Sequence, residues 1–217
     1  QRFRPDEDMR GTDTSSNRGK VIVFVKALTE QSGVRHLVQS LPMVRERHPG
    51  TRLVLIGTGP LAAEIDDMID RSGLKGAVEC TGRLPNERIP ERLNDADIFV
   101  LPSVPQENAE ESFSISLLEA MACAKPVIAS AIGGPKEIIE GGQDIGVLVP
   151  PGDPKAIADA VISLLDDPSR ARRIGENARR HVASTFTWDR ACEAFCAIYS
   201  EVLEGRPKGC SGRSHNG

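Results

Sequence analysis

The chain has 217 residues, of which 39% are hydrophobic and 27% charged, and its formal net charge at pH 7 is -4. This composition is typical of a globular protein, and the length suffices for one sizeable core. The small acidic excess excludes the basic surface expected of a nucleic-acid-binding protein. No secretory signal pattern and no apolar run of transmembrane length occur in the sequence, so we expect no transmembrane segment.

The five cysteines are odd in number and contain no CxxC pair: Cys80, Cys123, Cys192, Cys196 and Cys210. This pattern predicts reduced thiols in a cytoplasmic protein instead of a disulfide scaffold. Cys192 and Cys196 would share one face of a helix, and no histidine of metal-site spacing lies nearby. We therefore interpret both as core residues and expect neither a metal site nor a cofactor.

Residues 1–20 are polar and show no apolar periodicity, which predicts a linker or disordered arm. Residues 205–217 are Gly-rich and polar, and we expect a disordered tail there. Residues 21–204 remain as one predicted domain.

Within that domain, short apolar runs alternate with helical patterns. Strands are predicted at 21–25, 52–56, 77–81, 98–101, 127–129 and 146–149. Helices are predicted at 36–47, 86–94, 115–124, 154–166, 169–184 and 188–204, with a short one after Gly133. In the last helix, Ala191, Phe195, Ile198 and Val202 would form a core face. This alternation predicts an α/β fold, a doubly wound parallel sheet of about six strands that is Rossmann-like.

The most informative stretch follows the strand at 98–101. A polar loop leads to Glu111, and small and hydroxyl residues then open a short apolar helix that contains Glu119. A helix N-terminus at the carboxyl end of a parallel strand is a natural anion site. The ligand would meet backbone N–H groups of Phe113, Ser114, Ile115, Ser116 and Leu117.

The spacing of the two carboxylates limits the chemistry. If the chain were helical from Glu111 to Glu119, the eight steps would span about 12 Å. A retaining glycosidase needs two carboxylates about 5–5.5 Å apart, so hydrolysis by this pair is disfavoured. A local explanation of Glu119 is also open, because Ser116-Leu117-Leu118-Glu119 fits a capping box.

The stretch from Glu111 to Ala129 resembles the signature of the retaining family-four glycosyltransferases, in which two glutamates are separated by seven residues. The matching residues are Glu111, Ser112, Phe113, Glu119, Ala120, Met121, Ala122, Pro126, Val127, Ile128 and Ala129. Ser114 and Ala124 stand where that family usually has glycine. The resemblance extends over about residues 20–204 and implies the donor-binding half of a GT-B enzyme.

The resemblance also implies roles for individual residues. Glu111 would hold the transferred sugar and, with Lys26, act in catalysis, whereas Glu119 would hold the ribose. Lys26 would bind the donor diphosphate, but Ser32 stands where a second basic residue is expected, or Gln31 in the alternative register. Ser112 and the five residues after it would also bind substrate. The turn Gly82-Arg83-Leu84 would contact the nucleotide base through main-chain groups, and Gly57 would also bind substrate.

The implied partners are a nucleoside-diphosphate sugar and an N-terminal acceptor domain that has no counterpart in this chain. Arg2-Phe3-Arg4-Pro5 resembles the end of the linker between the two domains of such enzymes. The expected function is retaining glycosyl transfer to an acceptor hydroxyl, with this chain inactive alone.

Two other functions stay open at this point. Ser32 and Ser114 would also suit a nucleotide-binding module that has lost catalysis. The turn Gly57-Thr58-Gly59-Pro60-Leu61-Ala62 imitates a dinucleotide fingerprint, and Glu79 follows about twenty residues on, as in an NAD-type Rossmann enzyme. We interpret this turn as structural, because it follows the second strand instead of the first.

Overall fold

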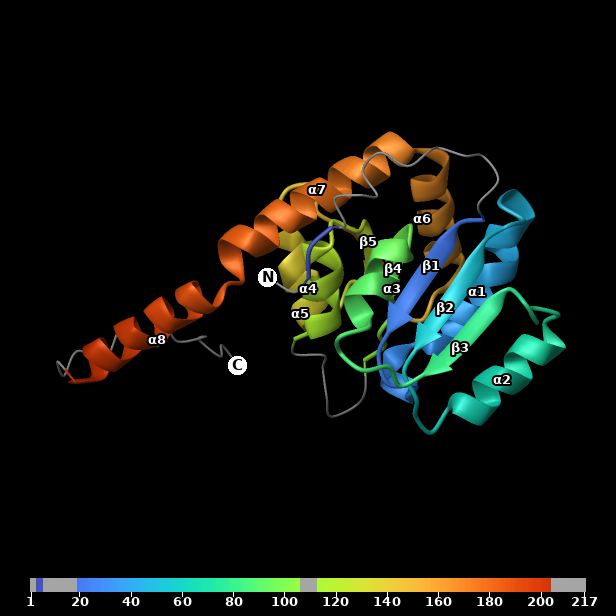
Figure 1. Cartoon of the computed structure of the whole chain (residues 1–217), viewed down its shortest axis with the longest axis horizontal. Coiled ribbons are helices and arrows are strands. Elements are labelled where there is room, and N and C mark those ends of the chain that lie inside the picture. Colours follow the sequence, from blue (N-terminus) through green and yellow to red (C-terminus); the bar gives the residue numbers. More distant parts are fainter. Residues whose placement is uncertain (1–2, 6–18, 106–112, 204–217) are drawn as a thin grey trace, which may run out of the picture.

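The computed structural model describes residues 3–5, 19–105 and 113–203. Its centre is one sheet of six parallel strands in the order β3-β2-β1-β4-β5-β6 (Figure 1). The strands are β1 (Val21–Val25), β2 (Arg52–Ile56), β3 (Val78–Gly82), β4 (Ile98–Leu101), β5 (Val127–Ser130) and β6 (Val147–Val149). The predicted α/β fold class and strand number are confirmed.

Helices cover both faces of the sheet. Side chains of alternate strand residues point to opposite faces, so Ile22 and Phe24 enter one core while Val21 and Val23 enter the other. The first core is closed by α1 (Val34–Arg47), α2 (Ala62–Arg71) and α6 (Pro154–Asp166). The second is closed by α3 (Ile89–Asp95), α4 (Ile115–Ala122), α5 (Gly133–Glu140) and α7 (Pro168–Thr185). The result is a three-layer, doubly wound domain.

N-cap residues determine where α6 and α7 begin. Asp153 Oδ1 accepts the Ala156 N–H at 3.0 Å at the start of α6, and Asp167 Oδ1 accepts the Arg170 N–H at 2.9 Å at the start of α7. Each cap is followed by proline, which suits the first helical position. These signals explain why the predicted limits of α6 agree with the structure and those of α7 lie within one residue.

The described part of the N-terminal segment lies against the domain. Phe3 packs against the second core, and the Arg4 carbonyl accepts a hydrogen bond from Asn94 Nδ2 of α3 at 3.0 Å. Residues 3–5 are therefore attached to the domain. Most of the predicted arm and the whole predicted tail lie outside the described residues.

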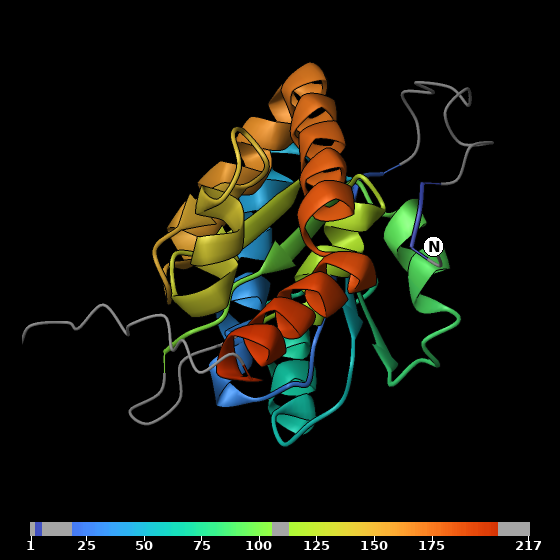
Figure 2. The same ribbon diagram turned by 90° about the vertical axis from the view of Figure 1, so that its left-hand side faces the viewer.

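The last helix, α8 (Trp188–Leu203), differs from the prediction. It projects from the rest of the domain (Figure 1) and lies in front of it when that side faces the viewer (Figure 2), and none of its residues is buried. The predicted core face is wrong, since Phe195, Ile198 and Val202 are all more than half exposed. Cys192 and Cys196 are also exposed, so their interpretation as core residues is wrong as well. The sequence correctly predicted a helix here, but an apolar pattern alone does not show whether the rest of this domain covers that face.

Candidate functional site

The sheet order creates one position where neighbouring connections diverge. β1 and β4 are adjacent, but the chain leaves β1 toward α1 on one face and leaves β4 toward α4 on the other. In open α/β sheets, ligands bind outside the carboxyl ends of the strands at such a switch point. Lys26 follows β1 there, and Ser103 lies just beyond the end of β4.

These two residues are in direct contact. Lys26 Nζ donates a hydrogen bond to Ser103 Oγ at 3.1 Å, and the Lys26 backbone N–H donates to the Ile56 carbonyl at 3.1 Å. Ser103 is fully buried. A cationic side chain is thus fixed across the ends of β1 and β4. Ser103 was not predicted as a site residue, because its contact with Lys26 depends on the pairing of β1 with β4.

The start of α4 faces the same edge of the sheet. Ser114 is the N-cap residue, with extended φ and ψ of -117° and 104°, and its carbonyl accepts the Leu118 N–H at 3.4 Å. A capping box from Ser116 is contradicted, because the helix begins two residues before the position which that pattern requires. Ser114 Oγ instead lies 3.4 Å from Ser116 Oγ.

The side chains around this helix start point in different directions. Leu117 is buried in the second core, so only its backbone N–H could meet a ligand, while Ile115 and Phe113 are 67% and 52% exposed. Glu119 is partly buried in the second turn of α4. The predicted residues Glu111 and Ser112 lie outside the described residues.

A short 3-10 helix, η2 (Glu30–Ser32), connects Lys26 with α1. Ser32 is fully buried, and its Oγ donates to the Thr29 carbonyl at 2.6 Å and accepts the Thr29 N–H at 3.3 Å. Gly33 follows with φ of +66°, and a Cβ there would lie 1.8 Å from the Pro102 carbonyl oxygen. Ser32 therefore closes a turn, and Gly33 allows that turn to pack directly against the exit of β4.

The turn after β2 uses its glycines for internal packing. A Cβ on Gly57 would lie 2.1 Å from the Lys26 carbonyl oxygen, and one on Gly59 would lie 2.4 Å from that of Leu28. Both close approaches are to the chain's own backbone, which supports the structural interpretation of this turn. The Gly57 N–H also donates to the Gly82 carbonyl at 2.9 Å, so the two predicted turn sites are neighbours.

Beyond Gly82, Arg83 is exposed and Leu84 packs partly against the second core. Gly82 itself has φ of +67°. β3 is two strands from β1, and the turn after it lies at the same edge of the sheet.

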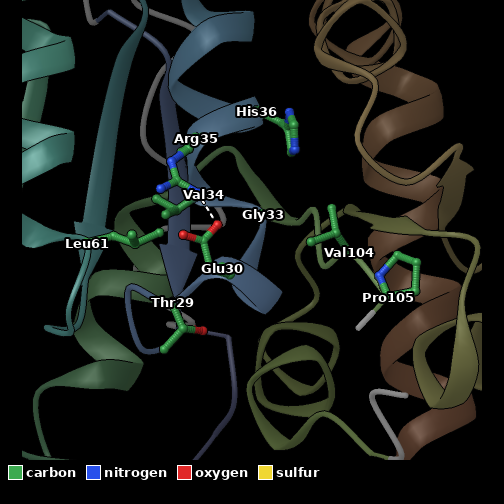
Figure 3. A pocket seen from close by; sticks show the side chains of 9 residues that line it. All are labelled: Thr29, Glu30, Gly33, Val34, Arg35, His36, Leu61, Val104 and Pro105. Atoms are coloured by element: carbon green, nitrogen blue, oxygen red, sulfur yellow. Dashed lines mark hydrogen bonds and ion pairs between the residues drawn. The ribbon is translucent and has the colours of Figure 1, made fainter. Parts of the chain in front are cut away.

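A pocket of about 230 Å³ lies beside the N-terminus of α1 (Figure 3). Its walls include Glu30 and Arg35 on one side and Val104 and Pro105 on the other, with His36 at one end. The His36 Nδ1 atom is buried and has no hydrogen-bond partner among the described residues. The pocket was not predicted, because its walls come from segments far apart in sequence: residues 29–36, Leu61 and residues 104–105.

Arg35 ties this pocket to the second βα unit. Its guanidinium donates to Glu30 and, through a 2.6 Å bond among others, to Glu64 of α2. The hydrogen bond from Arg35 lowers the pKa of Glu64, and the same contacts raise the pKa of Arg35. The positive charge of Arg35 is therefore already paired with two carboxylates, so Arg35 is poorly suited to bind an anionic ligand.

No group of three or more His, Cys, Asp and Glu side chains among the described residues could hold a metal ion. Among the same residues, no helix combines the length and apolar character needed to span a bilayer.

Comparison with known proteins identifies the family. The family model described as glycosyl transferases group 1 matches residues 6–181. An uncharacterised glycosyltransferase of Methanocaldococcus jannaschii is 32% identical over 185 residues, which are 85% of this chain and 46% of that protein. The chain therefore spans about half the length of this curated relative.

Solved structures agree with this assignment. Sucrose-phosphate synthase from Thermosynechococcus elongatus superposes with a TM-score of 0.77 at 27% identity, covering 94% of this chain and 50% of that one. The HepE protein of Anabaena in complex with UDP and glucose has a TM-score of 0.77 at 22% identity, with coverages of 92% and 54%. These neighbours share the GT-B architecture, of which this sheet forms one half. The chain belongs to the group 1 glycosyltransferases.

Proposed function

We propose that this chain is the donor-binding half of a retaining glycosyltransferase that uses a nucleoside-diphosphate sugar. The observation that carries the proposal is the Lys26–Ser103 contact at the switch point of the sheet, at the edge where α4 also begins. A fixed cation and a helix N-terminus at one edge are suited to the two negative charges of a diphosphate. The HepE complex with UDP and glucose supports this class of ligand.

Different residues would bind different parts of the donor. Lys26 and the N–H groups at the start of α4 would bind the diphosphate, and Glu119 would bind the ribose. Glu111, outside the described residues, would hold the transferred sugar. Charge develops on the diphosphate as the sugar leaves, so stabilisation of the leaving group would be the main catalytic contribution of this half. The proposed chemistry needs neither a metal ion nor a covalent nucleophile on the protein.

We further propose that an N-terminal acceptor domain completes the enzyme. The apolar face of α8 supports this, because it is exposed and larger than single scattered residues would explain. Its large members are Trp188, Phe195, Ile198, Tyr199, Val202 and Leu203. The partial coverage of the relatives is consistent with a second domain that would cover this face.

Calorimetric titration of the chain with UDP, GDP, NAD and the parent nucleosides tests the proposed ligand class. We expect one of the two nucleoside diphosphates to bind more tightly than its nucleoside, and NAD to bind no better than a nucleoside. Preferential binding of NAD would contradict the proposal and restore the dinucleotide interpretation of the Gly57 turn. Binding of UDP or GDP without any donor hydrolysis or transfer, even in the complete enzyme, would indicate a module that has lost catalysis.

The two glutamates should respond differently to substitution. We expect Glu119→Gln to weaken nucleoside-diphosphate binding by about tenfold, because one hydrogen bond to a charged group would be lost. Glu111→Gln should leave that binding nearly unchanged and should instead remove the extra affinity contributed by the sugar of the donor. The measurement is the Kd for UDP and for the UDP-sugar with each variant. Unchanged affinity in both variants, with altered stability alone, would mean that the glutamates are structural.

A further inference from the structure

A contact between two aromatic rings joins the entrance of α4 to the end of α7. The centroids of the Phe113 and Phe186 rings are 6.1 Å apart with the ring planes at 54°. Phe113 immediately precedes the N-cap Ser114, and Phe186 is the C-cap residue of α7, its N–H donating to the Val182 carbonyl. The distance and tilt lie in the favourable range for an aromatic pair.

Phe186 is itself held from the other side. The His181 ring meets it edge-on at a centroid distance of 5.7 Å, and a Cβ built on Gly142 would lie 3.1 Å from His181 Nδ1. Phe186 also packs against the second core, together with Leu118 of α4. The ring that touches Phe113 is therefore anchored on the domain, whereas Phe113 is 52% exposed.

We propose that Phe186 is a positioning residue for the donor site, because its ring fixes Phe113 and with it the first turn of α4. The proposal rests on the proposed function, in which the N–H groups of that turn bind the diphosphate. A half-exposed ring contributes little to the core, but it can restrict the backbone that enters the helix. If the contact is lost, the binding-competent arrangement is populated less, and the apparent affinity falls by the same factor.

The size of the effect follows from the ring contact. Beyond the effect of the apolar area that it buries, an aromatic pair contributes enough free energy to change an equilibrium constant by about 2- to 12-fold. The change should appear in two independent quantities. One is the exchange rate of the Leu118 amide hydrogen in the ligand-free chain, because its bond to the Ser114 carbonyl closes the first turn. The other is the Kd for UDP.

The variants separate positioning from general packing. Phe186→Leu keeps apolar volume but removes the ring, and Phe186→Tyr restores the ring. Trp188→Leu is the matched control, because this aromatic residue lies two positions on and is 87% exposed. The Phe99 amide, bonded to the Pro126 carbonyl in the central sheet, reports global opening.

We expect Phe186→Leu to raise both the Leu118 exchange rate and the Kd for UDP by about 2- to 12-fold, with Phe186→Tyr and Trp188→Leu close to wild type. In the double variant with Phe113→Ala, Phe186→Leu should add nothing further. Unchanged Leu118 exchange, an equal rise at Phe99, or additive effects of the two substitutions would overturn the proposal. A different result would separate the two proposals. If Phe186→Leu raises the Leu118 exchange rate but the wild-type chain binds neither UDP nor GDP, Phe186 still positions the start of α4, and the proposed function is wrong.

Discussion

The purified chain of 217 residues should show no measurable transfer of sugar from UDP-glucose or GDP-mannose to any acceptor, although we expect it to fold and to bind nucleotide. Transfer requires the acceptor hydroxyl to be held against the reacting carbon, and such positioning can lower a barrier by about 7–11 kcal/mol. In the proposed enzyme this would come from a cleft between two domains. The exposed apolar face of α8 is consistent with a surface that the second domain would cover.

Radiolabelled donors and chromatographic separation of products measure this directly. Slow hydrolysis of the donor is the most that we expect, and it serves as an internal indication that the donor reaches the site. Efficient transfer to a defined acceptor by the purified chain would contradict the need for a second domain.

Lys26→Ala should weaken binding of a nucleoside diphosphate by about 10- to 150-fold and leave binding of the bare nucleoside almost unchanged. A hydrogen bond to a charged group is worth about 1.5–3 kcal/mol, and the nucleoside lacks the charges that Lys26 would meet. Calorimetric Kd values for UDP and uridine, or GDP and guanosine, measure the difference. The loss should shrink as salt is raised, because added ions screen the same charges.

Lys20→Ala is the matched control. Lys20 precedes β1 at its opposite end, where its Nζ lies 3.2 Å from Asp97 Oδ1 at the surface. The control should retain wild-type affinity. If Lys26→Ala and Lys20→Ala weaken nucleoside-diphosphate binding equally, or if neither weakens it, Lys26 does not bind the diphosphate. Its role would then be limited to the contact with Ser103 at the strand ends.

The resemblance suggested that Ser32→Lys would restore a second basic residue for the diphosphate. The structure gives a reason to expect otherwise. Ser32 is fully buried and bonded to Thr29 on both its donor and acceptor sides. A lysine there would lose both bonds and carry its charge from a buried position, which is unfavourable without a partner. We therefore regard Ser32 as part of the turn that places Gly33 against β4.

Much of the fold followed from local patterns. Five of the six strands were recognisable as short, largely apolar runs, whereas the edge strand β3 reads Val-Glu-Cys-Thr-Gly and is at most partly buried. Asp153 and Asp167 cap α6 and α7, whose limits agree with the prediction to within one residue. The position of the site was predicted from the helix start at the carboxyl end of the strand at 98–101 and from the family resemblance, and the structure places β1 beside that strand.

The contacts within the site could not be predicted in the same way. Lys26 and Ser103 are 77 residues apart, and their pairing depends on the order of strands in the sheet. The same is true of the Arg35–Glu64 ion pair and of the pocket beside His36. Such contacts arise between elements that are distant in sequence, so no local periodicity reports them.

The errors also have physical causes. The apolar stripe of α8 has the period of a buried helix, but a helix that would be covered by another domain shows the same pattern. The proposed cap at Ser116 failed because several hydroxyl residues precede α4, and the chain turns at Ser114. A composition rich in capping residues predicts a helix start within a few positions and does not select one of them.

The central claim is that a nucleoside diphosphate binds across the ends of β1 and β4, at the start of α4. The most direct test is the map of amide chemical-shift changes when the isotope-labelled chain is titrated with UDP and GDP. We predict the largest changes at Lys26, Ser103 and residues 114–117, with smaller ones at Gly82 and Arg83. Changes confined to residues 57–62, or none with either nucleotide, would contradict this account.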